Sequence, residues 1–342
     1  GFMRSTTPEL CIRWYQTGAF YPFARNHNND MSIDQEPWVF LDRKLGSELL
    51  ETARVSLKAR YALLKWYYSL FIAAEGTGTI FRPLFFEFPD EERLYVDDGP
   101  TESQFLLGSS LMVTPNLQIG QYPMPVYFPR DTWFSFESGD KIIEEQEKDR
   151  YILVKSPLNE SAPTFIRGGH IVSIQDVSNI TSTEELNDEF ELVIALKRNN
   201  ESQILESKGS ILGVAKYDED TIYDRCIMKN CFYKIKAFVS SEKKRETILK
   251  IEFQAAVANN DDMLDPLGIF GLKIYNFPIN FMEEDEARFT NTLGFLHDKE
   301  GRILQSVLLK DAVLIHEKAF KIHFSQPIQI KSGNIISIKI MT

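Results

Sequence analysis

The chain has 342 residues, of which 43% are hydrophobic and 25% charged, and its formal net charge is −11. This composition is ordinary for a globular protein, and the length is sufficient for two or three domains. The acidic balance argues against nucleic acids and anionic membranes as main partners, because both require clustered lysine and arginine. No segment approaches the roughly 18 uncharged apolar residues that a membrane-spanning helix needs.

The N-terminal region begins with a helix signal. Thr7 is a good N-cap and Pro8 suits the first helical position. The apolar residues that follow have helical spacing: Leu10, Cys11, Trp14 and Tyr15. A short aromatic strand, residues 19–23, is expected next, and it should lead directly into a polar loop over residues 25–34.

This polar loop is the most informative segment of the sequence. It carries a cation, Arg25, and an imidazole, His27, and three acids are in or next to it: Asp30, Asp34 and Glu36. A strand that leads into such a loop is typical of the active face of a barrel enzyme. The three acids would make a weak metal site without a glycine-turned loop, so we expect them to be solvated loop acids.

Residues 47–75 give the clearest helix prediction. Their apolar residues recur at intervals of three and four, which is helical spacing: Leu50, Ala53, Leu57, Tyr61, Leu64, Tyr68 and Phe71. From residue 79 onward the periodicity falls to two, with frequent Pro and Gly, which predicts antiparallel β structure.

Two β units are predicted after this helix. In the first we expect strands at residues 80–86, 105–114, 124–128, 132–136, 151–155 and 166–172. In the second we expect them at 190–196, 233–239, 247–253, 270–275, 307–308, 312–315 and 334–340. The polar segment 176–188 is the expected linker. The domain boundaries are therefore predicted at 1–78, 79–175 and 176–342.

The short length of the α/β region leaves two architectures open. A complete (β/α)8 barrel takes roughly 250 residues, whereas only about 75 residues here have an α/β pattern. The chain is therefore either a small α/β cap on a β protein or the end of a longer barrel enzyme.

The cysteines and glycosylation motifs bear on the cell compartment. Cys226 and Cys231 are close enough in sequence to form a disulfide, although both could equally be reduced. Three N-glycosylation motifs occur in turn-like sequence, at Asn159, Asn179 and Asn200. Together these motifs favour an exported protein.

Several segments of the sequence resemble glycoside hydrolase family 31, the α-glucosidases. They are residues 7–28, 35–38, 60–64, 82–89, 104–111, 128–134 and 165–169. The resemblance is strong over residues 1–172 and weak beyond. The Arg25-Asn26-His27-Asn28 motif resembles the lysosomal, maltase and sucrase-isomaltase type more than the endoplasmic-reticulum type.

The resemblance implies a multidomain, mostly β chain, namely the C-terminal end of a (β/α)8 barrel followed by two β-sandwich domains. The implied enzyme is a retaining α-glucosidase that hydrolyses terminal α-linked glucose from oligosaccharides. The two aspartates that serve the family as nucleophile and acid/base lie on earlier barrel strands, and neither matching motif occurs here. We therefore expect the chain to be the C-terminal portion of such an enzyme and to be inactive alone. The alternative is a non-catalytic β-sandwich module that binds carbohydrate or protein.

The resemblance also assigns roles to individual residues. It implies that His27 contacts the sugar in the −1 subsite, that Arg25 helps to hold the loop, and that Phe2 lines the pocket wall. It also implies that Cys11 would bond a cysteine placed upstream of Gly1. No cofactor or metal is expected, and the expected substrate of the intact enzyme is an oligosaccharide or a maltose-like sugar. The expected location is the secretory pathway, lysosomal or secreted.

Overall fold

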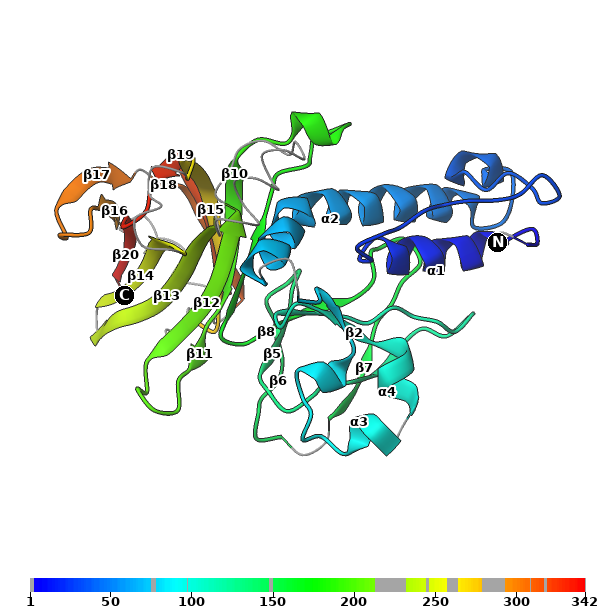
Figure 1. Ribbon diagram of the computed structural model, residues 1–342, viewed down its shortest axis with the longest axis horizontal. Coiled ribbons are helices and arrows are strands. Elements are labelled where there is room, and N and C mark those ends of the chain that lie inside the picture. Colours follow the sequence, from blue (N-terminus) through cyan, green and yellow to red (C-terminus); the bar gives the residue numbers. More distant parts are fainter. Residues whose placement is uncertain are drawn as a thin grey trace. The chain divides into compact units, whose positions relative to one another are not determined.

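The computed structural model describes most of the chain, and its contacts divide the chain into two compact units (Figure 1). The described residues are 3–74, 78–96, 98–147, 150–212, 232–243, 246–256, 264–278, 293–307, 309–316 and 319–341. Unit 1 comprises residues 1–62, 80–131 and 143–165, and unit 2 comprises residues 63–79, 132–142 and 166–342. The predicted domain boundaries at residues 78 and 175 stay a prediction.

The first helix of unit 1 confirms the sequence prediction. Helix α1 spans Pro8–Gly18, with Pro8 at its start. The backbone N–H of Leu10 donates to the hydroxyl oxygen of Thr7 at 3.3 Å, which satisfies one of the unpaired amides of the first turn. A short 3-10 helix, η1 (Pro37–Phe40), closes the polar loop that follows α1.

The strand predicted at residues 19–23 is wrong, because these residues form turns. No neighbouring strand within the described residues offers hydrogen-bond partners to this segment. Its carbonyl groups instead accept hydrogen bonds from the guanidinium group of Arg60, at Ala19, Tyr21 and Pro22. Aromatic content alone therefore does not make a strand here, since a strand also needs ladder partners.

The long helix is confirmed as α2, Gly46–Ala73, and small polar residues occupy part of its buried face. Thr52 and Ser69 are fully buried, whereas Leu57 is 44% and Phe71 39% exposed. The buried hydroxyls donate to carbonyls one turn earlier in the helix, at 2.7 Å for Thr52 and 2.8 Å for Ser69. This local bonding lets small polar residues occupy the packed face. Within the described part of the chain, no helix is long and apolar enough to cross a membrane.

The remainder of unit 1 combines short strands with short helices. These elements are β1 (Phe81–Arg82), η2 (Leu84–Phe86), α3 (Arg93–Val96), α4 (Asp98–Ser103), β2 (Phe105–Leu107), β3 (Leu111–Val113), β4 (Met124–Tyr127) and β7 (Tyr151–Val154). Strands β1, β2 and β3 pair consecutively and antiparallel, and β4 pairs with β7. The strand predicted at 105–114 is split at Gly108, whose φ of +56° belongs to the left-handed region that glycine tolerates.

The remaining strands extend to the end of the described chain. They are β5 (Trp133–Ser135), β6 (Lys141–Ile143), β8 (Thr164–Arg167), β9 (His170–Ile174), β10 (Glu189–Ala195), β11 (Lys197–Arg198), β12 (Leu205–Leu212), β13 (Phe232–Lys243), β14 (Glu246–Ala255), β15 (Leu267–Tyr275), β16 (Leu293–His297), β17 (Ile303–Val307), β18 (Leu309–His316), β19 (Ala319–Ile330) and β20 (Ile335–Met341). A 3-10 turn, η3 (Thr183–Glu185), lies in the predicted linker.

Unit 2 is built on one 12-stranded sheet. Its order is β17-β16-β20-β14-β13-β12-β9-β10-β15-β19-β18, and β11 pairs with β12. The two terminal strands of this order, β17 and β18, are separated in sequence only by Leu308, so the sheet comes close to closing on itself. Most pairs are antiparallel as predicted, but β10 and β15 are parallel, which the sequence analysis did not anticipate.

The sequence analysis also missed β19. The polar run Ser325-Gln326-Pro327 interrupts its alternation, and the pairing of β15 with β19 is irregular at this point. Ile269 pairs with Ile328, whereas Gly271 pairs with His323, so the proline lies in the irregular stretch and not in a regular ladder.

The inner face of this sheet forms a large apolar core. Its fully buried members include Phe190, Leu192, Ile194, Leu249, Ile251, Leu272, Ile274, Ile322, Ile336 and Ile338. Trp66 of α2 and Trp133 of β5 are also buried, at 1% and 0% exposed. The mostly β prediction is therefore correct, and this burial is the main source of stability in unit 2.

The opposite face of strand β10 carries a buried charge. Glu191 is 2% exposed, and its carboxylate lies 2.9 Å from Nζ of Lys321, 3.4 Å from Nζ of Lys273 and 3.5 Å from Nε2 of His323. Nearby, the hydroxyl of Tyr275 donates to the carbonyl of Phe136 at 2.9 Å. Charge pairing compensates the burial of Glu191, because an unpaired carboxylate there would be costly.

Candidate functional site

The polar loop of unit 1 extends over residues 24–36 in the structure. The residues just before it are held in place by their neighbours. Arg60 of α2 donates to the carbonyls of Ala19 at 3.1 Å and Pro22 at 3.0 Å, and also to that of Tyr21. The ring of Tyr21 packs edge-on against those of Phe81 and Phe105, with centroids 5.2 and 5.6 Å away. Helix and strand residues therefore hold the start of the loop by hydrogen bonds and aromatic contacts.

The two predicted sugar-site residues of the loop are in contact. Nη2 of Arg25 lies 3.2 Å from Nδ1 of His27, and both side chains are exposed. A guanidinium group can only donate, so Nδ1 of the imidazole must accept. The proton of the neutral ring then resides on Nε2, which makes this atom a hydrogen-bond donor.

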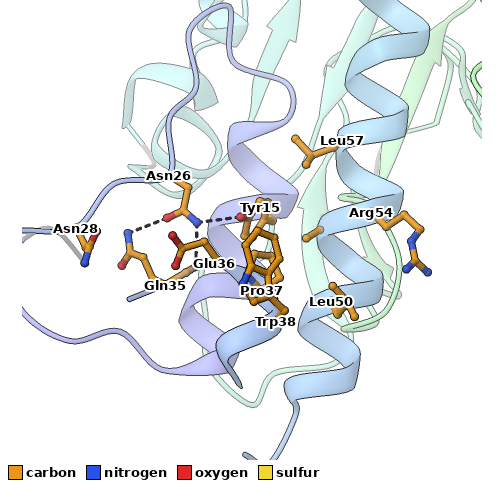
Figure 2. Close-up of a pocket in the computed structure, with 11 residues that line it drawn as sticks. Tyr15, Asn26, Asn28, Gln35, Glu36, Pro37, Trp38, Leu50, Arg54 and Leu57 are labelled. Carbon is orange, nitrogen blue, oxygen red and sulfur yellow. Dashed lines mark hydrogen bonds between the residues drawn. The ribbon is translucent and has the colours of Figure 1, made fainter. Parts of the chain in front are cut away.

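A network of amide groups connects the two ends of the loop, as Figure 2 shows. Nδ2 of Asn26 donates to the hydroxyl of Tyr15 and to the backbone carbonyl of Gln35, both at 2.9 Å. Nε2 of Gln35 donates to Oδ1 of Asn26 at 2.8 Å and to the backbone carbonyl of His27 at 2.5 Å. Asn26 and His27 are thus tied to the far end of the loop, and Asn26 is also tied to α1.

Two cavities flank this network. The larger, of about 580 Å³, is lined by Arg25, His27, Trp14, Phe23 and Arg60 among others. The smaller, of about 390 Å³, is lined by Tyr15, Asn26, Gln35, Trp38 and Leu57 among others (Figure 2). Both volumes lie in the range of small-ligand pockets, and aromatic surface beside polar groups is a lining that suits a sugar ring.

Burial shifts the pKa values of several titratable groups near the cavities. It raises the pKa of the Cys11 thiol to about 11, so the thiolate is scarce at neutral pH. Burial also raises the pKa values of Tyr15 and Tyr21, although the hydrogen bond from Asn26 opposes this at Tyr15. These tyrosines are therefore neutral hydrogen-bonding groups at physiological pH.

The acids of the loop are surface groups. Asp30, Asp34 and Glu36 are all exposed, as expected for solvated carboxylates. The residues on either side of Glu36, Gln35 and Pro37, are buried. No cluster of potential metal ligands occurs among the described residues.

The other predicted site residues have different outcomes. Phe2, Cys226 and Cys231 lie outside the described residues, so their predicted roles stay predictions. Asn159, Asn179 and Asn200 are each exposed and in turns, where a glycan could be attached. Cys11 is buried and free.

Sequence reasoning missed three residues that organise the loop: Tyr15, Asn26 and Arg60. The sequence placed Tyr15 only on the apolar side of a helix, Asn26 only in a motif of the resemblance, and Arg60 only in another segment of the resemblance. The only available signal was the pair of amides, Asn26 and Gln35, that flank a segment with His27. Such a spacing does not by itself predict that the two side chains meet.

Comparisons with known proteins place this loop in a family. The model of the glycosyl hydrolases family 31 TIM-barrel domain matches residues 1–70, and that of the family 31 C-terminal domain matches residues 77–172. These ranges agree with the region in which the sequence resemblance is strong.

Curated relatives and a solved structure agree with the family models. The lysosomal acid alpha-glucosidase of Tetrahymena pyriformis is 36% identical over 248 residues, which cover 69% of this chain and 26% of that protein. The intestinal sucrase-isomaltase of Homo sapiens is 37% identical over 202 residues, which cover 58% of this chain and 10% of that protein. The glucosidase II alpha subunit, with Tris bound, superposes with a TM-score of 0.69 at 19% identity, over 100% of this chain and 34% of that chain.

The structural likeness supports the fold alone, and the chain spans about a quarter of the length of the Tetrahymena relative. The two family models nevertheless cover the described loop, both cavities and strands β1–β8. The chain therefore belongs to glycoside hydrolase family 31.

Proposed function

We propose that this chain forms part of the sugar site of a retaining α-glucosidase, with His27 as a group that contacts the substrate. The observation that carries the proposal is the contact of Arg25 with His27 beside a 580 Å³ cavity, in the segment matched by the family's barrel model. The names of the relatives, which include lysosomal alpha-glucosidase and sucrase-isomaltase, support α-linked glucose as the substrate class.

The chemistry assigned to His27 follows from its tautomer. Retaining glycosidases pass through an oxocarbenium-like transition state in which hydrogen bonds to the sugar hydroxyls strengthen. An imidazole whose Nδ1 accepts from Arg25 presents Nε2 as a donor to such a hydroxyl. Arg25 thus fixes the proton on the required nitrogen and needs no contact with the sugar itself.

The two catalytic carboxylates are proposed to come from outside this chain. In support, the described residues that line the larger cavity include two arginines and a histidine but no Asp or Glu. The family chemistry requires a nucleophile and an acid/base on opposite sides of the glycosidic bond. On this proposal the chain supplies part of the site that binds glucose, and another segment supplies the bond-breaking groups.

The test is glucose release from maltose by two proteins. One is the 342-residue chain alone, and the other is a chimera in which this chain replaces the matching portion of the Tetrahymena relative. We expect release by the chimera and none by the chain. Release by the chain alone would contradict the assignment of the carboxylates. A folded but inactive chimera that still bound maltose or a protein partner would favour a non-catalytic binding module.

We further propose that the protein resides in the secretory pathway and is glycosylated at Asn159, Asn179 and Asn200. The lysosomal relatives and the exposure of the three asparagines support this proposal. Treatment of the protein from its source with an N-glycosidase should lower its mass. An unchanged mass would show that none of the three positions carries a glycan.

A further inference from the structure

His27 lies in an exposed part of the polar loop. Its side chain is exposed, and so are those of Arg25 and Asn26 beside it. An exposed ring samples several rotamers unless the backbone that carries it is held and a polar partner selects the orientation. Arg25 supplies a polar partner at Nδ1 of His27. The backbone at His27 must be held by a different group.

Gln35 holds the backbone at His27. Its amide nitrogen uses both hydrogens, one to Oδ1 of Asn26 at 2.8 Å and one to the carbonyl oxygen of His27 at 2.5 Å. Asn26 reciprocates with a hydrogen bond from Nδ2 to the carbonyl oxygen of Gln35 at 2.9 Å. Two successive residues, Asn26 and His27, are thereby tied to one side chain, which we name the amide clamp of Asn26 and Gln35.

The amide clamp is itself anchored. Gln35 is only 7% exposed, between the loop and helix α1, and Pro37 after it is buried. The second hydrogen of the Asn26 amide goes to the hydroxyl of Tyr15 at 2.9 Å, and this tyrosine belongs to α1 (Figure 2). A buried amide with satisfied donors is a rigid support, because releasing it would leave polar groups unpaired.

We infer that Gln35 is a positioning residue for His27, which it holds through Asn26 and through the His27 carbonyl so that the imidazole faces the sugar in one orientation. This inference rests on the proposed function of His27. Gln35 does not touch the substrate, and its contribution lies in the geometry of the loop.

The first test uses the 342-residue chain and the variant Gln35→Met, which keeps the side-chain length and removes both donors. The matched control is Asp34→Asn, an exposed neighbour. Trypsin cleaves after Arg25 only when the loop opens, so we expect cleavage there to become about tenfold faster in Gln35→Met, since about two hydrogen bonds are lost. The control should cleave at the rate of the unmodified chain.

NMR distinguishes a positioning role of Gln35 from a general contribution of Gln35 to stability. The NMR resonances of the His27 ring should shift and broaden in Gln35→Met, whereas those of His170 and His323 should stay in place. A lower Tm with unchanged His27 resonances and unchanged cleavage would show that Gln35 only stabilises the fold, and would overturn the inference. If Gln35→Met does not fold, Asn26→Ala removes the exposed half of the clamp and is measured in its place.

The second test is a double-mutant cycle in the active chimera, with Gln35→Met and His27→Ala. Gln35→Met should lower kcat about tenfold with little change in KM when His27 is present, and should have no further effect in His27→Ala. An equal loss in both backgrounds, or no loss in either, would overturn the inference. If His27→Ala alone costs nothing, the proposed function fails, while cleavage and NMR still report whether the clamp orients the ring.

Discussion

The polar loop of unit 1 and the sheet of unit 2 hold their residues by different means. In the sheet, side chains such as Phe253 and Ile194 are 0–1% exposed and are fixed by close packing on every side. In the loop, His27 and Asn26 are exposed and are fixed by hydrogen bonds that Gln35 and Arg25 donate to them and that Asn26 donates to Tyr15. Damage to the sheet should therefore appear as lost stability, and damage to the loop as lost geometry at a folded site.

The largest expected loss of stability comes from truncating a core side chain in the sheet. Phe253→Ala should lower the free energy of unfolding by about 3–5 kcal/mol, because it removes apolar contacts and leaves a cavity. Urea unfolding followed by fluorescence measures this. The matched change in the loop, Phe23→Ala, removes a side chain that is 77% exposed and should change the free energy by less than about 0.5 kcal/mol. Equal losses would contradict the contrast between the two regions.

The next largest effect is on the pH dependence of stability, and it comes from a buried cation in unit 2. Lys65 of α2 is 1% exposed and pairs with Asp188. Burial lowers its pKa from 10.5 to about 8, although Asp265 attracts the charged form. A pKa below that of the unfolded chain means that the folded state binds the proton less well, so this group destabilises the fold below pH 8 and the penalty disappears between pH 8 and 10.5.

The unfolding free energy of the chain should accordingly contain a component that rises with pH over this window, by about 1.4 kcal/mol per unit of pKa difference. Lys65→Met should remove the component, whereas Lys234→Met, which removes an exposed cation, should leave it. Urea titrations at several pH values measure it. A component of the opposite sign would show that the pairing with Asp188 outweighs burial.

These two regions also differ in how well the sequence predicted them. The apolar alternation of strands such as β13 and β14 was readable, because half-buried strands impose a period of two. The parallel pairing of β10 with β15 was not readable, because it depends on segments about 80 residues apart. The burial of hydroxyls on α2, such as that of Thr52, was not predicted, because these hydroxyls bond to their own helix and so can be buried.

For the site, the sequence indicated Arg25 and His27, because the type and order of these residues resemble a known motif. It could not show that Gln35 reaches back to Asn26, since the fold of an irregular loop is set by its own hydrogen bonds and not by periodicity. The strand predicted at residues 19–23 was wrong for a related reason, because the partner of its carbonyls is Arg60, about 40 residues further along the chain.

A smaller effect is expected at the start of α1. Thr7→Ala removes the acceptor of the Leu10 amide and should cost about 1 kcal/mol of stability. Thr7→Ser, which keeps the hydroxyl, should cost less. Thermal unfolding of both variants checks this, and equal losses would show that the methyl group and not the cap is important.

The smallest effect concerns the reactivity of one thiol. Because burial raises the pKa of Cys11 to about 11, alkylation of Cys11 in the folded chain at pH 7 should be much slower than that of the same residue in denaturant. Mass spectrometry of a peptide that contains Cys11 measures both rates. Fast labelling in the folded chain would show that the helix α1 opens readily at this position.

The imidazole of His27 is proposed to contact the sugar, in a role that is chemical and not structural. The most direct measurement is kcat/KM of the chimera for maltose together with its Tm, for His27→Ala and for the control Asp34→Asn. We predict that His27→Ala lowers kcat/KM by about 100-fold with a nearly unchanged Tm, since it removes one preorganised contact to the transition state. Asp34→Asn should change neither quantity. A large fall in Tm with near-normal kcat/KM in His27→Ala would contradict the account.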